Sequence, residues 1–502
     1  MNATLGNKRG WRILGRLLLT AAILATLLAA FYTEEDWRGK RAWENYKREW
    51  EAKGEKFDWQ AFVPPSVPDD QNFFTTPIFT NMLNGKIVMT PYHSDSSPNI
   101  WPENNQVGYL GGEGKTKITD LKTYQASYRN PGNASLAKEF PIAPQPQTPA
   151  ADVLFALGKF DSAVEELRQA SQRPYANVPL NYEDGFNSVS PLLPVLAALK
   201  RCTQVLQLRA VAELADGQSA KSLDDVKLLL YLNNSLRNSP FLISHLVRMA
   251  IVAYELNPIW EGLAEHRWSD EQLVALDAEL SKLDFLADYG FVMRGERAFA
   301  IASFENQRRT REIISRQEYG DLVTNKLTFM PSAYFYQNEL AIARMQQQWL
   351  LPIVDTNSRI VSPAAWQRAN DAVRAETEHY HFPAYQTQAL MLFPAISSTL
   401  RKLAAIQSSV DLARVACALE RYRLAHGEYP ETLDELSPQF IAKVPHDIIN
   451  GQPLHYHRTD GGQFILYSVG WNEIDDGGQV VLTKDGSVDR ERGDWVWQYP
   501  TK

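Results

Sequence analysis

The chain has 502 residues, of which 44% are hydrophobic and 22% charged, and its formal net charge at pH 7 is −8. This composition is typical of an ordered protein with two or three domains and excludes global disorder. Outside the extreme N-terminus the sequence contains no long basic run, so it offers no basic face for a nucleic acid. We therefore predict no nucleic-acid partner.

The N-terminus predicts a membrane anchor. Residues 1–16 are basic, and residues 17–32 form an uncharged apolar run. Charged residues flank this run on both sides: Lys8, Arg9, Arg12 and Arg16 before it, and Glu34, Glu35 and Asp36 after it. The positive-inside rule then predicts a single-pass membrane protein with a cytoplasmic N-terminus and an extracytoplasmic bulk, and the resemblance given below implies the bacterial inner membrane and the periplasm. The run is somewhat shorter than the ~20 residues that span a bilayer, and a cleaved signal peptide is the alternative.

Residues 33–149 are expected to carry little regular structure. A charged helix is predicted for residues 33–56, followed by a segment rich in proline, glycine and asparagine, with short strands at GKIVMT (residues 85–90) and TKITDL (residues 116–121). The stretch Gly108–Thr116 is similar to a phosphate-binding loop, but Tyr109 stands where the first glycine is needed. We predict no nucleotide partner.

Residues 150–402 have the apolar periodicity of an antiparallel helical array. Helix breaks are predicted at Asp216–Gly217, at Ser239–Pro240 and before Pro258, and Ser269 is predicted to start a helix. Further helices are expected at residues 285–318, 335–351, 363–379 and 394–426. The predicted fold class is therefore mainly α.

Few residues in this array suggest chemistry. The sequence contains no HExxH, GxSxG or CxxC motif, and Glu255 and Glu296 are single carboxylates on apolar helical faces. Such carboxylates usually pair with an arginine and have a structural role. Cys202 and Cys417 lie in apolar helical stretches, where two buried thiols are favoured over a disulfide.

Two histidine pairs have weak metal-binding character. His379 and His381 follow Glu376 and Glu378, and His455 and His457 lie within a predicted strand. Neither pair has the spacing of four residues that places two histidines on one face of a helix. Solvated polar side chains are the preferred interpretation for both pairs.

Residues 403–502 carry the strongest pattern in the chain. An apolar helix that ends in ERYRLAHGEYP is followed by a short second helix, a Pro445–Asp447 step, two strands, and an acidic glycine-rich loop after Tyr467. This arrangement resembles the globular domain of the major pseudopilins of type II secretion systems. The whole chain also resembles a group of large bacterial membrane-anchored proteins of unknown function that share this tail. The glycine-then-Phe-Thr-Leu-Ile-Glu processing site of true pseudopilins is absent.

The resemblance implies a small α+β domain with a calcium site in the loop SVGWNEIDDGG. Carried over by position, Ser468, Asp475 and Asp476 would be the ligands, supplemented by Asn472 and Glu473. Calcium takes six to eight oxygen ligands, which such a loop can supply. A tight turn, in which the glycines provide positive backbone angles, is the alternative. The aromatic residues Trp495 and Trp497 are expected to pack on the sheet, with an exposed binding pair as the alternative.

The function expected from these features is binding rather than catalysis. We predict a non-catalytic, membrane-anchored extracytoplasmic protein whose helical array binds a protein partner in the cell envelope and whose tail serves secretion or envelope assembly. The alternative is an envelope hydrolase acting on glycan or peptide through carboxylates in a helical groove. Calcium is the one cofactor that the resemblance implies.

Overall fold

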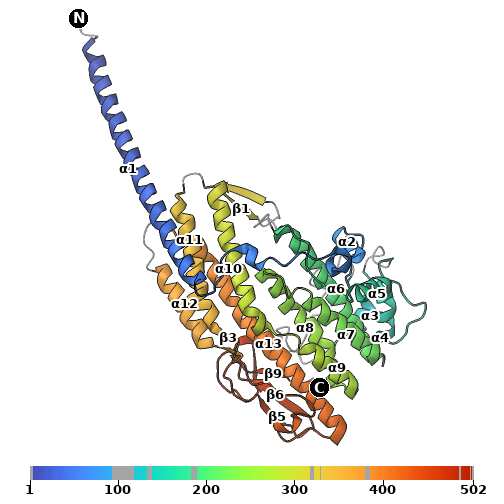
Figure 1. The fold of residues 1–502 in the computed structure, drawn as a ribbon. Helices are drawn as coiled ribbons and strands as arrows, with labels where there is room; N and C mark the ends of the chain where they lie inside the picture. Colours follow the sequence, from blue (N-terminus) through green and yellow to red (C-terminus); the bar gives the residue numbers. More distant parts are fainter. Residues whose placement is uncertain are drawn as a thin grey trace. The chain divides into compact units, whose positions relative to one another are not determined.

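The structure is a computed structural model that describes residues 4–92, 118–132, 138–182, 189–316, 322–327, 330–378, 385–484, 488–497 and 499. It is mainly helical, as predicted (Figure 1). The chain divides into two compact units, which we describe separately. Unit 1 comprises Met1–Ala61, Arg297–Gln348 and Asp371–Pro394, and unit 2 comprises Phe62–Glu296, Trp349–Asn370 and Ala395–Lys502. The helices α10 (Phe285–Thr310), α12 (Pro363–Glu378) and α13 (Thr387–His426) contribute residues to both units.

Unit 1 is built around α1 (Thr4–Glu51), one unbroken helix of 48 residues (Figure 1). The predicted anchor and the predicted charged helix are thus a single element. The prediction of an N-terminal apolar helix is confirmed: its most apolar window has a mean hydropathy of 2.1, no residue of it is buried, and it is long enough to cross a membrane. Beyond the apolar run the tryptophans do not share one face, since Trp37 is 55% exposed and Trp43 only 6%.

The C-terminal half of α1 packs along α11 (Ser332–Met345). Asp36 accepts a hydrogen bond from the Ala333 amide at 2.7 Å, where α11 begins. The fully buried Arg297 pairs with Glu55 at 2.6 Å and lies over the ring of Phe57 at 4.4 Å. A buried arginine needs such a carboxylate partner, and this pair fixes the segment that follows α1.

A β-hairpin in unit 1 differs from the prediction. The helix expected over residues 285–318 ends at Thr310, and Arg311 has a φ of 59°, which ends the helix. The antiparallel strands β1 (Glu312–Arg316) and β2 (Leu322–Lys326) follow, in the register Ile314 opposite Thr324. The β-branched residues of these two segments favour strands once the helix has ended.

Unit 2 contains most of the secondary structure. Its helices are α2 (Pro77–Leu83), α3 (Leu121–Arg129), α4 (Pro149–Leu157), α5 (Asp161–Ala170), α6 (Val189–Ala215), α7 (Ser219–Asn234), α8 (Leu242–Ala264), α9 (Asp270–Leu280) and the short 3₁₀ helix η10 (Leu433–Leu436). Its strands are β3 (Val354–Asp355), β4 (Ile360–Val361), β5 (His455–Arg458), β6 (Phe464–Ser468), β7 (Val480–Leu482), β8 (Val488–Gly493) and β9 (Trp495–Trp497). The helices α6, α7 and α8 pack against one another and form the centre of the unit.

Most of the predicted helix ends in unit 2 are confirmed. Gly217, with a φ of 78°, separates α6 from α7, and Ser269 caps α9 through a reciprocal pair of hydrogen bonds with Gln272. The break predicted before Pro258 is wrong, because α8 continues through it. The neighbouring Ile259 and Trp260 are buried, so tertiary packing compensates for the lost backbone hydrogen bond.

The strands predicted between residues 57 and 149 are not formed in the described part of that segment. Residues 87–90 and 118–120 have no regular structure, and α2 and α3 lie beside them. The side chain of Asp120 accepts hydrogen bonds from the amides of Lys122 and Thr123 and so starts α3. The prediction overlooked this cap.

The tail of the chain contains small sheets, as predicted. Strands β5, β6 and β9 form an antiparallel sheet in that order, and β7 pairs with β8. The prediction that Trp495 and Trp497 pack inward is confirmed, since they are only 6% and 2% exposed. The helix that leads into the tail is α13, and the predicted boundary after residue 402 falls inside it. One hydrophobic cluster joins this helix to α8 and to the sheet through residues such as Trp260, Val410 and Trp497.

Candidate functional site

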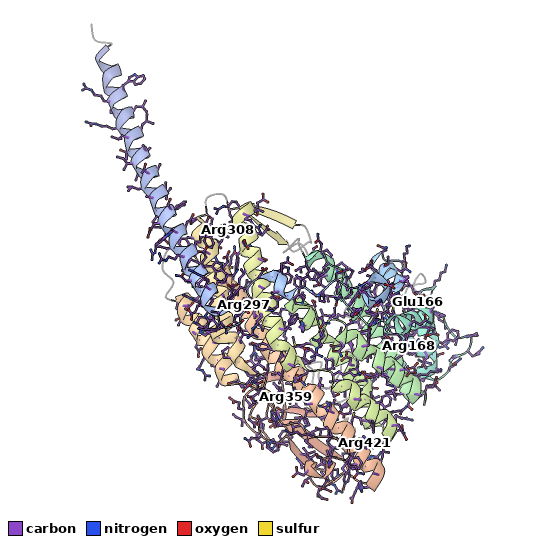
Figure 2. The ribbon with its side chains drawn as sticks, viewed as in Figure 1. Glu166, Arg168, Arg297, Arg308, Arg359 and Arg421 are labelled. Atoms are coloured by element: carbon purple, nitrogen blue, oxygen red, sulfur yellow. The ribbon has the colours of Figure 1, made fainter. Side chains whose placement is uncertain are left out.

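The helices α5, α7 and α9 line a charged groove of about 430 Å³ in unit 2. Such a volume lies within the range of about 300–1,000 Å³ of small-molecule sites. The charged and aromatic residues that line it are Arg168, Asp224, Lys227, Tyr231, Glu279 and Lys282. Arg168, labelled in Figure 2, belongs to α5. The groove therefore combines three cations with two carboxylates.

The position of two of these cations follows from the ends of the helices. The helices α5 and α9 end at Ala170 and Leu280, and Arg168 and Lys282 lie within two residues of those ends. The carbonyl groups at a helix C-terminus carry partial negative charge, which favours cations there. Lys282 also pairs with Glu279 at 2.7 Å. Within the described part of the chain Lys227 makes no ion pair, which leaves it able to bind an anionic group.

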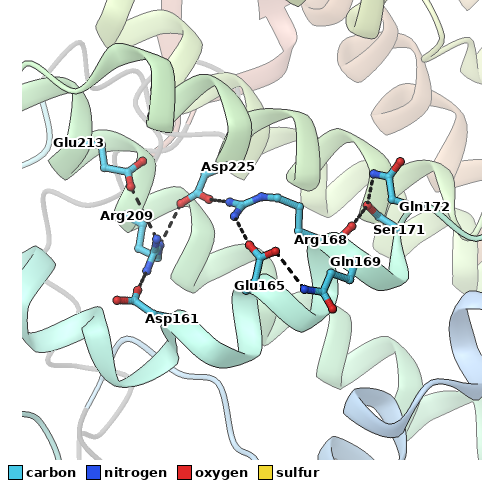
Figure 3. A network of polar contacts seen from close by, with 9 residues as sticks. All are labelled: Asp161, Glu165, Arg168, Gln169, Ser171, Gln172, Arg209, Glu213 and Asp225. Carbon is cyan, nitrogen blue, oxygen red and sulfur yellow. Dashed lines mark hydrogen bonds and ion pairs between the residues drawn. The ribbon is translucent and has the colours of Figure 1, made fainter.

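A network of charges, with Asp225 and Glu213 buried at its centre, lies behind the groove (Figure 3). Arg168 donates to Asp225 at 2.8 Å and pairs with Glu165 at 3.0 Å. On the other side of Asp225, Arg209 donates to it at 3.0 Å and also pairs with Glu213 at 3.7 Å. The carboxylate of Asp225 thus bridges two arginines that come from α5 and α6, and it fixes the position of Arg168 in the groove wall.

The two innermost carboxylates have altered acidity. Burial, followed by the charge of Asp225, raises the pKa of Glu213 to about 8. Burial also raises the pKa of Asp225, although Arg209 opposes this effect. A hydrolase with carboxylates in a helical groove would need such groups to face its substrate. Glu213 and Asp225 are only 3% and 1% exposed and do not line the groove, so their position suits a structural role.

The single carboxylates singled out in the sequence also have structural roles. Glu296 accepts a hydrogen bond from the Leu242 amide at 3.0 Å and so caps the start of α8. Glu255 is fully buried and accepts from Asn233 at 3.4 Å. Burial raises the pKa of Glu255 well above its ordinary value. Its neighbour Arg248 pairs with Asp288 at 2.9 Å.

The acidic loop of the tail connects β6 to β7. Ser468, the first predicted calcium ligand, is fully buried. Its hydroxyl donates to Asp447 at 2.9 Å and accepts from the Gly470 amide at 3.2 Å. Asp447 also accepts from the amides of Val469 and Ile449, each at 2.9 Å. The Pro445–Asp447 step noted in the sequence therefore fixes the start of the loop, a role that the sequence did not indicate.

The other two predicted ligands are exposed in the same loop. Asp475 accepts from the Tyr467 hydroxyl and the Gly477 amide, both at 3.0 Å, and lies 3.3 Å from a ring nitrogen of His455. The hydrogen bond from Gly477, followed by that from Tyr467, lowers the pKa of Asp475. Asp476 accepts from Asn472 at 3.0 Å.

The far end of the loop is held by Asp494, which sequence reasoning missed. This carboxylate is 1% exposed and accepts from the amides of Gly478 at 2.7 Å and Asp476 at 3.3 Å. Burial raises the pKa of Asp494. The one sequence signal for it is its position between Gly493 and Trp495, at the start of β9. Asp447 and Asp494 thus hold the two ends of the loop.

The loop offers fewer calcium ligands than the resemblance implies. Ser468 is engaged with protein groups, and the Asn472 side-chain oxygen accepts from the Ile474 amide, which leaves the carboxylates of Glu473, Asp475 and Asp476 and the neighbouring carbonyl groups as oxygen donors. In the described ranges no group of three or more His, Cys, Asp or Glu residues is arranged to hold a metal ion. Calcium binding stays a prediction.

The other candidate residues from the sequence are the two histidine pairs, the stretch 108–116 and the two cysteines. His455 and His457 lie on β5, and both rings lie near that of Tyr467, His455 stacked on it at 4.9 Å. His379, His381 and the stretch 108–116 lie outside the described residues. The prediction of two buried thiols is confirmed, since Cys202 and Cys417 are free and buried.

Comparisons with protein-family models, with curated proteins and with solved structures give no match to this chain. The resemblance of the tail to pseudopilins therefore rests on the sequence pattern alone.

Proposed function

We propose that this protein is a non-catalytic, membrane-anchored extracytoplasmic binding protein and that the groove of unit 2 receives an anionic group of a protein partner. The observation that carries the proposal is the set of Arg168, Lys227 and Lys282 around one groove. Arg168 is held by Asp225 behind the wall, and Lys227 has no ion-pair partner among the described residues. The cations of the groove support recognition of an anionic group, and the buried carboxylates of Glu213 and Asp225, whose pKa values are raised, do not line the groove, which favours binding over hydrolysis.

The tail would serve as a second contact with an envelope or secretion assembly. The sequence pattern of residues 403–502 supports this part of the proposal, together with the small antiparallel sheets that follow α13. The membrane topology is proposed from the basic residues before the apolar run and the acidic residues after it, which favour a cytoplasmic N-terminus.

The groove is tested with a photo-crosslinking residue at Gln172, which lines it. The full-length protein is crosslinked in native membranes, and Lys227→Glu is compared with Lys122→Glu, which reverses an exposed charge on α3. We expect Lys227→Glu to weaken capture about 10-fold, or ~1.4 kcal/mol, and Lys122→Glu to leave it unchanged. Equal capture by both variants would contradict the groove as the site. Crosslinks from residues 403–502 to the same partner would support the role of the tail.

The topology is tested by labelling a cysteine introduced at the exposed Lys53. The two natural cysteines are buried, so the background is low. We expect a membrane-impermeant maleimide to label Lys53→Cys from the periplasmic side. Labelling only after the membrane is opened would place the bulk of the chain on the cytoplasmic side.

A further inference from the structure

Three sulfur atoms meet in the interior of unit 2. The Cys202 Sγ, from α6, lies 3.6 Å from the Met82 Sδ and 3.7 Å from the Met89 Sδ. Cys202, Met82 and Met89 are 0%, 4% and 1% exposed. The whole chain has 2 cysteines and 8 methionines, so three of its ten sulfur atoms are gathered at one point.

The local fold brings the two methionines together. Met82 lies in the last turn of α2, and Gly85, with a φ of 70°, reverses the chain after it. Met89 then lies beside Met82, and both face Cys202. The adjacent residues Leu83 and Val88 are 43% and 51% exposed, so the sulfur atoms lie one layer below the surface.

The chemical type of the three sulfur ligands indicates which metal ion they would bind. Thioether and thiolate sulfur are soft donors that favour Cu(I), whereas carboxylate and carbonyl oxygen favour magnesium and calcium. A trigonal metal–sulfur site with bonds of about 2.3 Å has sulfur atoms about 4 Å apart. The two separations from the Cys202 sulfur are a few tenths of an ångström shorter, so these two contacts need little adjustment. We propose that Met82, Met89 and Cys202 form a binding site for Cu(I).

The cysteine provides the charge of the site. Burial raises the pKa of the Cys202 thiol to about 12, so without an ion the group is protonated. Binding breaks the S–H bond, forms the S–Cu bond and releases one proton, while the two methionines bind as neutral ligands. No change of oxidation state is involved. Affinity should therefore rise with pH. The site is separate from the groove and does not depend on the function proposed for it.

The test is a competition titration of the detergent-solubilised full-length protein with Cu(I) and a chromophoric chelator, in the absence of oxygen. We expect one tightly bound Cu(I) and an X-ray absorption spectrum with only sulfur neighbours at about 2.3 Å. The double variant Met82→Leu/Met89→Leu keeps the side-chain volume and should fold. It should bind at least about 100-fold more weakly, since changes even outside the ligand shell cost about 10–100-fold. Cys202→Ala should lose the tightly bound ion.

Matched controls separate the site from general sulfur chemistry. Cys417→Ala and Met293→Leu change a buried cysteine and a buried methionine elsewhere, and they should bind as the parent protein does. The proposal is overturned if the parent protein binds no tight equivalent of Cu(I), or if the double methionine variant binds it equally well. The second result would mean that the three sulfur atoms are apolar core packing only.

Discussion

Replacing Glu213 with Gln is expected to change how stability depends on pH. Glu213 is 3% exposed, its closest cation is Arg209 at 3.7 Å, and its second oxygen has no hydrogen-bond partner among the described residues. A carboxylate in this position is more stable protonated than charged. Gln has the same shape as the protonated acid, so the substitution removes the titration and leaves the packing in place.

The size of the expected difference in stability follows from the pKa of Glu213. In the folded protein the pKa of Glu213 is raised from its ordinary 4.5 to about 8. The folded state therefore holds the proton more tightly than the unfolded state, and the stability from this group is fully present below pH 4.5. It falls as the pH rises towards 8 and is then constant. The difference of 3.5 in pKa corresponds to at most about 5 kcal/mol.

The measurement is urea unfolding of the solubilised full-length protein between pH 5 and pH 9. At pH 5 the variant should be the more stable by only about 1 kcal/mol or less, because the loss of stability in the parent has just begun. Above pH 8 the variant should be the more stable by at least about 2 kcal/mol. Glu165→Gln is the control, because Glu165 is 54% exposed and its pair with Arg168 contributes little. Parallel pH profiles for the parent and Glu213→Gln would refute the reasoning.

Three further outcomes are expected. Asp447→Asn should lower the free energy of unfolding in the urea assay by about 2–4 kcal/mol, because the Asp447 carboxylate accepts three hydrogen bonds. Ser468→Ala removes only one of these three donors and should lower the free energy of unfolding by less. Gly295→Ala should destabilise by about 1–3 kcal/mol or more in thermal unfolding, since the added carbon would lie 2.5 Å from the Pro240 carbonyl oxygen; an unchanged melting temperature would contradict that contact. If the tail binds calcium, a chelator should lower the melting temperature of the parent but not of Asp475→Asn, and no shift in the parent would end the calcium proposal.

The helices could be predicted because their signals are local. Gly217 and Ser269 mark the ends of helices through backbone conformation and capping, and both act within a few residues. The helix break predicted before Pro258 was wrong because the contribution that decides the structure there is not local. The local effect of Pro258 is to break a helix, but the burial of α8 around Ile259 and Trp260 outweighs it. A sequence pattern does not contain that tertiary contribution.

The groove could not be predicted, because it depends on contacts between helices far apart in the sequence. Arg168 pairs with Asp225, 57 residues later, and nothing in the local sequence of either residue indicates the pair. The same holds for Ser468 and Asp447, which are 21 residues apart. The position of the acidic loop was predictable from its glycines and aspartates, whereas the carboxylates that hold it were not.

The packing of α13 bears on what the tail can do in an assembly. In the sequence this helix occupies the place of the apolar helix at the start of a pseudopilin-like domain. In unit 2 its residues Leu400, Val410 and Leu419 are fully buried, and the last two belong to the cluster that includes Trp260 of α8. The face of α13 that carries these three residues packs into the core of unit 2, so this face is not available for packing into a filament. The apolar side chains of the tail that remain accessible include Ile474 of the acidic loop and Leu482 of β7, which are 59% and 47% exposed.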